Sequence, residues 1–362
     1  MSIKKVLVAI ASLVGATFVA CASLAACSSD DNPDPVINNE NENDTTPDPM
    51  DDNHVVIAYV SAWGAATPEP TYMTHINYAF GHVSETFNSI DIQNPDNLKK
   101  VAALKELNPD LKVLLSLGGW GSGRFSEMAA DEALRTAFAE DCRRVVDEYK
   151  IDGIDVDWEY PGSNVAGISS SPDDPANFVL LLKDIRQAIG SERLLTIATG
   201  ATGTGMLFSE LLPYVDFINI MSYDLADPPM HHAPLYKSKY SGYITVDGCV
   251  QKHLQAGVPA AKLVLGVPFY GRGCDVYAWS VPYNKITVLP GCTECWDDDA
   301  KVPYIADAAG KFVLGFENAK SLTIKRAYIK DKGLKGIMYW EYSQDSATSD
   351  LRRAAAGMLK VK

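Results

Sequence analysis

The sequence predicts a (β/α)8 TIM barrel, and two observations carry the prediction. Short apolar runs rich in β-branched residues recur along the chain, at Val55–Val60, His75–Phe80, Lys112–Leu117, Gly153–Trp158, Leu194–Thr199, Phe217–Met221, Leu263–Val267 and Gly336–Tyr339. Helical patterns lie between most of these runs, at Asp96–Leu107, Asp131–Tyr149, Asp174–Ile189, Val246–Ala256, Ala319–Lys332 and Ser346–Leu359. Eight strands with interleaved helices over about 310 residues suit a closed α/β barrel.

Local chemistry supports each kind of element. The predicted strands are almost continuously apolar, which is typical of parallel strands that are covered on both faces. Several helical patterns begin with Asp or Ser, whose side chains can cap free backbone N–H groups. An open doubly wound sheet is the alternative, but no glycine-rich turn follows the first strand. The regular repeats therefore favour closure.

One connection is too long to be a simple loop. About 50 residues separate the seventh strand from its helix, and they include Cys274, Cys292 and Cys295. We expect an insertion over about 273–316 at the C-terminal face, where it forms a small wall of sheet beside the cleft. A disulfide from Cys274 to one of the other two cysteines is expected, with zinc binding or three free thiols as alternatives.

Composition limits the possible partners. The chain has 362 residues, is 47% hydrophobic and carries a net charge of −14. The acidic balance argues against nucleic acid as a partner, because binding phosphates requires a basic surface. Outside the first 27 residues no apolar run reaches the ~20 residues of a membrane-spanning helix. We expect a globular domain at 54–362 that is a monomer.

The N-terminus predicts export. Residues 1–27 have a positive start followed by an apolar stretch, and Leu24-Ala25-Ala26-Cys27 resembles a bacterial lipobox in which Cys27 is lipidated. An ordinary cleaved signal peptide with an incidental cysteine is the alternative. Residues 28–53 contain nine acidic residues and no Lys or Arg, which predicts a disordered linker. The expected location is the outer membrane, with cell-surface exposure as a further option suggested by the acidic start of the linker.

The fourth predicted strand carries the chemistry. Side chains alternate along a strand, so Asp155, Asp157 and Glu159 share one face and the apolar residues between them share the other. The apolar face would contact the helices, which directs the three acids into the barrel. Stacked carboxyls are costly there unless they share protons, so the pattern indicates a catalytic site. A solvated acidic strand is the alternative, and a metal site would need a histidine nearby in the sequence.

This segment resembles the DxxDxDxE signature of glycoside hydrolase family 18. Asp152, Asp155, Asp157 and Glu159 complete the match. Further family-like segments follow the expected order, namely Ser116–Gly119 (SxGG), Met221–Asp224 (MxYD), Gly266–Arg272 and Gly336–Trp340. The resemblance extends from residue 55 to about residue 345.

The resemblance implies a retaining mechanism in which the substrate's own 2-acetamido group attacks the anomeric carbon and forms an oxazolinium ion. Glu159 would be the general acid and then the base. Asp157 would orient the acetamido N–H, Asp155 would share a proton with Asp157, and Tyr223 would hydrogen-bond the acetamido oxygen. The implied function is cleavage of β-1,4 linkages in chitin or chitooligosaccharides by an endo-acting chitinase, with no cofactor and no metal.

The resemblance also implies substrate contacts. Trp340 would form the floor under the sugar and Asp224 a polar contact. The other candidates lie at or beyond strand ends: Met221, Tyr59, Trp63, Phe80, Trp120 and Arg272. Trp63 and Trp120 could instead be packing residues, and Arg272 could instead be a structural ion-pair partner. His231 and His232 are expected to be loop residues, with metal ligands as the alternative. The aromatic residue that many chitinases carry shortly after MxYD is missing here.

Two other functions stay open. One is an endo-β-N-acetylglucosaminidase that cuts the chitobiose core of N-glycans. The other is a non-catalytic sugar-binding relative, although such proteins usually replace the catalytic glutamate, which is present here as Glu159.

Overall fold

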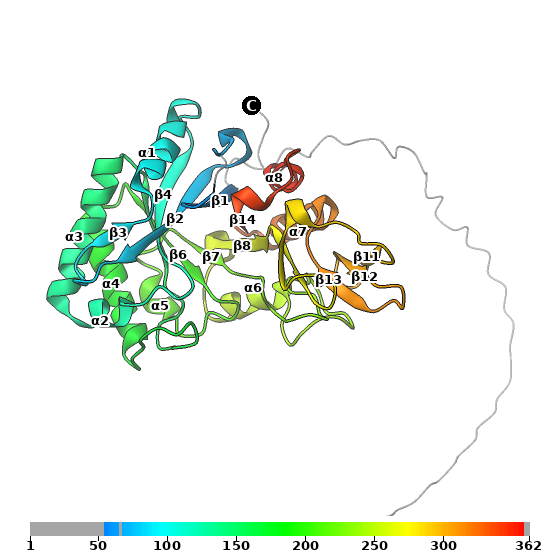
Figure 1. Ribbon diagram of the computed structural model, residues 1–362. Coiled ribbons are helices and arrows are strands. Elements are labelled where there is room, and N and C mark those ends of the chain that lie inside the picture. The colour runs from blue at the N-terminus through cyan, green and yellow to red at the C-terminus, as the bar shows by residue number, and fades with distance from the viewer. Residues whose placement is uncertain (1–53, 65–66, 358–362) are drawn as a thin grey trace, which may run out of the picture. The chain divides into compact units, whose positions relative to one another are not determined.

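Parallel strands that close on themselves form the framework of this computed structural model, which describes residues 54–64 and 67–357. Eight strands in this part of the chain build the barrel (Figure 1): β1 (Val55–Ser61), β2 (His75–Val83), β4 (Lys112–Gly118), β5 (Gly153–Asp157), β6 (Leu194–Thr199), β7 (Phe217–Ile220), β8 (Leu263–Pro268) and β14 (Gly336–Trp340). They pair in the order β1-β14-β8-β7-β6-β5-β4-β2, and β1 pairs again with β2. The predicted closed barrel is confirmed. The signal, the linker and Cys27 lie outside the described residues.

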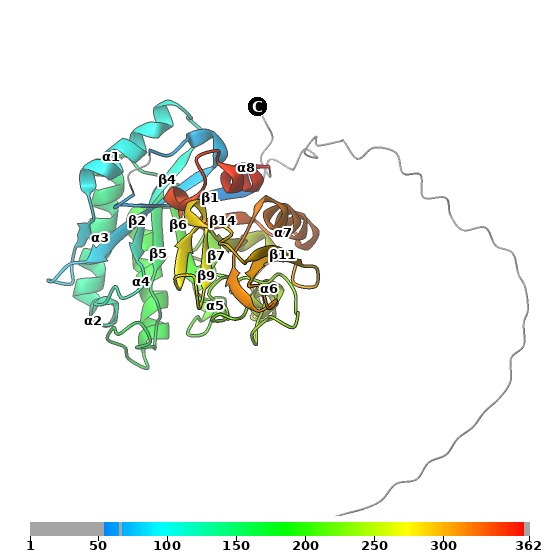
Figure 2. The same cartoon turned by 45° about the vertical axis from the view of Figure 1, so that its right-hand side comes forward.

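The helices lie outside the strands (Figures 1 and 2). They are α1 (Pro95–Ala103), α2 (Phe125–Ala130), α3 (Glu132–Tyr149), α4 (Asp174–Ile189), α5 (Phe208–Leu211), α6 (Val246–Gln255), α7 (Ala319–Lys332) and α8 (Asp350–Ala356). The last helix begins four residues later than predicted, because the Asp345 carboxylate accepts from the N–H groups of Leu351 and Arg352. Short 3₁₀ turns occupy Pro70–Tyr72, Leu104–Glu106, Ala260–Lys262, Tyr283–Lys285 and Tyr342–Gln344. No helix among the described residues is long and apolar enough to cross a membrane.

The packing of β5 confirms which way its side chains point. Ile154, Val156 and Trp158 are fully buried in the large core between strands and helices. The Trp158 ring stacks on Phe125 of α2, with centroids 5.3 Å apart, and meets Phe178 of α4 edge-on at 5.6 Å. The alternate residues of β5 therefore face the barrel axis, as the alternation predicted.

A second, five-stranded antiparallel sheet lies between β8 and α7. Its order is β10 (Ser280–Pro282), β9 (Tyr270–Gly273), β13 (Phe312–Gly315), β12 (Val302–Ala306) and β11 (Thr293–Asp297). Figure 2 shows β9 and β11 together with α7. A small core of Ile305, Val313, Leu314 and Phe316 holds this insertion together. One further short strand, β3 (Ile90–Ile92), pairs antiparallel with the end of β2.

The predicted disulfide is wrong. Cys274, Cys292 and Cys295 all have free thiols. Cys274 follows β9, whereas Cys295 lies on β11, and β13 and β12 separate these two strands. Three strand spacings of about 4.8 Å place the two backbones about 14 Å apart, twice the reach of a disulfide.

Candidate active site

Asp155 lies inside the barrel and is completely buried. Its Oδ2 accepts hydrogen bonds from the hydroxyls of Tyr59 (2.8 Å) and Ser116 (2.7 Å). Its Oδ1 accepts from the Thr196 hydroxyl (2.6 Å) and the Asn219 amide (3.1 Å). Burial raises the pKa of Asp155, and these four hydrogen bonds partly offset that rise because they favour the ionised form.

Asp157 has far fewer hydrogen-bond partners than Asp155. It is buried, and its Oδ1 has no hydrogen-bond partner. Burial, followed by the negative charges of Glu159 and Asp155, raises the pKa of Asp157 well above its ordinary value. Among the described residues no hydrogen bond joins Asp157 to Asp155, whose oxygens already accept from four donors, so the expected proton sharing has no direct contact here.

Glu159 follows the end of β5 and is also buried. Burial raises the pKa of this carboxyl to about 7. A hydrogen bond with Tyr160 lowers the pKa, and the negative charge of Asp224 raises it. A substantial fraction of Glu159 is therefore protonated at neutral pH, as a general acid requires.

Four of the predicted aromatic contacts gather at the end of β14. Trp340 stacks on Phe80, with ring centroids 5.6 Å apart and an interplanar angle of 20°. Tyr59 lies 5.8 Å and Trp63 6.4 Å from the Trp340 ring. Met221 packs against the same small cluster inside the barrel. An apolar floor of this kind suits the flat face of a pyranose ring.

Tyr223 connects this floor to the acids. Its ring packs against the same interior cluster as Trp340 and lies 6.3 Å from Tyr270. Burial raises the pKa of Tyr223 well above 10, and the charges of Tyr270, Asp157 and Glu159 raise it further. Its hydroxyl therefore stays protonated and can donate a hydrogen bond.

Asp224 is held by a cationic partner from the insertion. Arg272 on β9 donates from Nε to Oδ1 (2.7 Å) and from a terminal nitrogen to Oδ2 (2.6 Å). The Tyr270 hydroxyl donates to Oδ2 (2.9 Å), and His232 Nδ1 lies 3.4 Å from Oδ1. Burial alone would raise the pKa of Asp224, but His232 and Arg272 bring it well below its ordinary value. Of the two roles considered for Arg272, the structure shows the ion pair.

Trp120 stands apart from the other aromatic candidates. Its side chain is 65% exposed, and within the described residues it takes part in no aromatic ring contact. It follows the Gly118–Gly119 turn, in which Gly118 has a φ of 124° and a Cβ there would lie 2.1 Å from the Asp157 carbonyl oxygen. Gly118 lets β4 approach the backbone of β5 closely, and Gly119 leaves room for the Phe80 ring, which would lie 2.7 Å from a Cβ there. The SxGG segment therefore has a packing role.

Sequence analysis missed several residues that shape the site. Thr196 and Asn219 bind Asp155, Tyr270 and His232 contact Asp224, and Tyr160 contacts Glu159. Of these residues, only Thr196 and Asn219 stand out in the sequence, since each is a polar residue inside a predicted apolar strand. Their partners depend on strand register, which a single sequence does not reveal.

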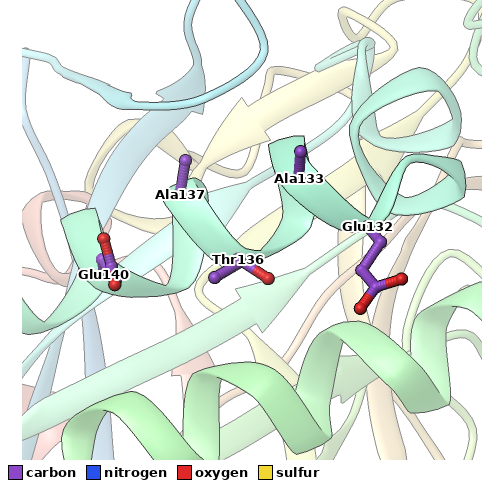
Figure 3. A pocket seen from close by; sticks show the side chains of 5 residues that line it. All are labelled: Glu132, Ala133, Thr136, Ala137 and Glu140. Atoms are coloured by element: carbon purple, nitrogen blue, oxygen red, sulfur yellow. The ribbon is translucent and has the colours of Figure 1, made fainter.

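A depression on the surface of α3 does not resemble this site. A depression along α3 is lined by Glu132, Ala133, Thr136, Ala137 and Glu140 (Figure 3). It offers two acids and no aromatic ring to a sugar. No group of three or more His, Cys, Asp or Glu among the described residues is arranged to hold a metal ion.

Stacked buried carboxyls beside an aromatic floor, at the carboxyl ends of barrel strands, define a glycoside hydrolase. Residues 55–345 match the model of the glycosyl hydrolases family 18. The chain belongs to this family, which confirms the family prediction.

Relatives agree with this assignment. Chitinase A1 of Niallia circulans is 35% identical over 81% of this chain and 57% of its own length. Chitinase B of Serratia marcescens is 28% identical over 88% of this chain and 80% of its own length. A family 18 N-acetylglucosaminidase structure from Paenibacillus barengoltzii is 37% identical, with a TM-score of 0.76, and covers 85% of this chain and all of its own. The predicted chitinase-like class of glycosidase is thus supported, although this chain spans little more than half of chitinase A1.

Proposed function

We propose that this protein hydrolyses β-1,4 linkages between N-acetylglucosamine units in chitin or chitooligosaccharides, with retention of anomeric configuration. The observation that carries the proposal is the pair Asp157 and Glu159. Asp157 offers a buried oxygen with no partner, and Glu159 is a buried carboxyl with a pKa of about 7. The names of the chitinase relatives support the choice of substrate.

The proposed reaction begins with a sugar lying on Trp340. Its acetamido N–H donates to the unpaired Oδ1 of Asp157, and Tyr223 donates to the acetamido oxygen, so that this oxygen faces the anomeric carbon. Glu159 protonates the glycosidic oxygen as the acetamido oxygen attacks, and the bond to the leaving sugar breaks. The oxazolinium charge is balanced by Asp157, whose negative charge is costly in the empty site and useful here.

In the second step Glu159, now ionised, takes a proton from water. The water opens the oxazolinium ring at the anomeric carbon, and this second inversion restores the β configuration. Proton NMR during the first minutes of hydrolysis of chitotetraose tests this sequence, since the β-anomer must appear first. Early release of the α-anomer would mean direct attack by water and would remove the role of Asp157.

We favour cleavage within a chain of several sugars. Exposed tryptophans lie on several elements around the acids: Trp63 after β1 is 63% exposed, Trp120 after β4 is 65% exposed and Trp279 in the insertion is 57% exposed. Such side chains can support sugars on more than one side of the cleaved bond. The 37% identical N-acetylglucosaminidase raises a second candidate, which is release of single sugars from chain ends.

One incubation separates these functions. Chitohexaose and a high-mannose glycopeptide are treated with wild-type protein and with Glu159→Gln as the matched inactive control, and product masses are measured. Dimers and trimers from the hexamer support the proposal, whereas only monosaccharide indicates the exo-acting alternative. Cleavage of the glycopeptide alone would identify an enzyme of the N-glycan core. No product from any substrate would indicate a sugar-binding relative.

We also propose export and lipid anchoring at Cys27, which places the enzyme at the outer membrane. The Leu24-Ala25-Ala26-Cys27 sequence and the acidic segment after it support this proposal. The Cys27→Ala variant should leave the membrane fraction and keep its specific activity. If that variant still sediments with membranes, the anchor lies elsewhere.

A further inference from the structure

The tripeptide His231–Ala233 lies in the long connection between β7 and α6. His231 and His232 are loop residues, as predicted, but both side chains are buried and only 2% exposed. Each of the three residues is held by a different part of the structure. Its middle residue, His232, contacts Asp224.

His231 attaches the tripeptide to the five-stranded sheet. Its Nε2 lies 3.1 Å from Oδ2 of Asp297 on β11, and its backbone N–H donates to the Tyr240 carbonyl (2.8 Å). The ring meets Phe312 and Tyr304 edge-on, with centroids 5.1 and 5.7 Å away. This side of the tripeptide therefore cannot shift without disturbing β11, β12 and β13.

Ala233 attaches the other end to α7. Its carbonyl accepts a hydrogen bond from the Lys325 ammonium (2.7 Å). Lys325 is completely buried and is paired with Glu317, which is buried as well. Separating the members of such a buried ion pair would strongly destabilise the fold, so Lys325 holds the Ala233 carbonyl firmly in place.

His232, between these two anchors, faces Asp224. Its carbonyl accepts from the N–H of Leu225, the residue directly after Asp224 (2.9 Å). Its Nδ1 lies 3.4 Å from Asp224 Oδ1, and its ring lies against Tyr270 at 5.3 Å. Neither ring nitrogen has a hydrogen-bond partner among the described residues, so the contact with Asp224 is the closest polar contact that the structure gives for this buried ring.

We propose that His232 is a positioning residue for Asp224, and that the insertion and α7 act on the active site through it. The proposal rests on the function proposed above. The Asp224 side chain is 41% exposed, and its backbone has a φ of 54°, so its position needs support from its surroundings. Arg272 binds both oxygens from β9, and His232 contacts Oδ1 from the loop. Contacts from two directions keep the carboxylate from rotating away from Glu159.

A double-mutant cycle tests this coupling. His232→Leu should lower kcat/KM on chitotetraose about tenfold, the effect expected for loss of a contact to a charged group. In an Asp224→Ala background, the same change should cost less than about twofold, because the side chain that His232 positions is absent. Equal losses in both backgrounds would show a merely structural role and overturn the proposal.

Conservative variants and a control sharpen the result. His232→Asn keeps an N–H donor near the position of Nδ1 and should retain most activity, whereas His232→Gln places its donor near Nε2 and should not. His253→Leu is the matched control, since His253 is also buried but contacts Thr199 and the Cys249 carbonyl. The loss of kcat/KM caused by His253→Leu should be the same with and without the Asp224 side chain. Activity of His232→Gln equal to that of His232→Asn would contradict the geometry, even if His232→Leu does not fold.

Failure of the proposed function would look different. A wild-type protein inactive on every N-acetylglucosamine substrate would refute the function, and the cycle would then be measured by urea unfolding, which needs no catalysis. Non-additive losses in the free energy of unfolding at residues 232 and 224 would support the coupling. Additive losses there would reject the coupling independently of the function.

Discussion

Replacing Glu159 by Gln should stabilise the fold while it removes activity. Burial raises the pKa of Glu159 from 4.5 to about 7, because the charged form is desolvated. One pKa unit corresponds to about 1.4 kcal/mol, so ionising this carboxyl in the folded protein costs about 3 kcal/mol relative to the unfolded chain. A neutral amide of the same shape avoids that cost. Activity should fall about 10²–10⁴-fold, because the amide cannot donate and accept the proton.

The sign of the pH dependence follows from linkage. Below about pH 4.5 Glu159 is protonated in both states, so the variant and the wild type should differ little in this respect. Between pH 4.5 and about 7 only the unfolded chain releases the proton, and the wild-type free energy of unfolding falls relative to the variant. Above about pH 7 the full difference of about 3 kcal/mol is reached.

Urea unfolding of both proteins across this pH range measures the difference. Asp224→Asn is the control of opposite sign, because the pKa of Asp224 is lowered in the folded protein. That variant should be less stable than wild type at neutral pH, and the difference should disappear as the pH falls well below 3.8. A Glu159→Gln advantage that does not change with pH would refute the argument that Glu159 is held protonated by burial.

Three further predictions concern the neighbouring carboxyls. Asp157→Asn should lower kcat at least about a hundredfold, because an amide cannot balance the oxazolinium charge, and calorimetry should still detect chitotetraose; lost binding would contradict this. Asp155→Ala should leave the buried hydroxyls of Tyr59, Ser116 and Thr196 without the carboxylate that accepts from them and, at about 1 kcal/mol each, reduce the free energy of urea unfolding by about 3 kcal/mol. The Asn219 amide keeps a contact of 3.4 Å to the Tyr59 hydroxyl, and a loss below about 1 kcal/mol would disprove the prediction. The fall in kcat/KM on the alkaline side, near pH 7, reports ionisation of Glu159. In Asp224→Asn it should move to lower pH, since the negative charge of Asp224 raises the pKa of Glu159. A shift to higher pH would be inconsistent with the structure.

The sequence predicted the barrel and the direction of the acids because both depend on local pattern. Alternation along one strand places Asp155 and Asp157 on the inner face whatever the neighbouring strands do. The four donors to Asp155 could not be predicted in the same way. Tyr59 and Asn219 lie 96 and 64 residues away from it, and only the register of the closed sheet brings them together.

The insertion was the least predictable region for a related reason. Its length showed that something interrupts the repeat, but three cysteines close in sequence suggested a disulfide, whereas all three thiols are free and the sheet order separates Cys274 from Cys295. The pairing of strands within an antiparallel sheet is set by nonlocal contacts, so spacing along the chain is a poor guide to distance. The same ambiguity left Arg272 open as a ligand or an ion-pair partner.

The contacts of His232 and Arg272 explain how two neighbouring carboxyls can have well-separated pKa values. The pKa of Asp224 is lowered because His232 and Arg272 contact it, whereas Glu159 has no ion-pair partner within the described chain and burial raises its pKa to about 7. A pair of acids with separated pKa values is the usual arrangement for acid–base catalysis. Arg272, the cation that contributes to this separation, comes from β9, the first strand of the insertion sheet along the chain. The barrel supplies the acid at residue 159, and the insertion supplies the charge that keeps Asp224 ionised beside it.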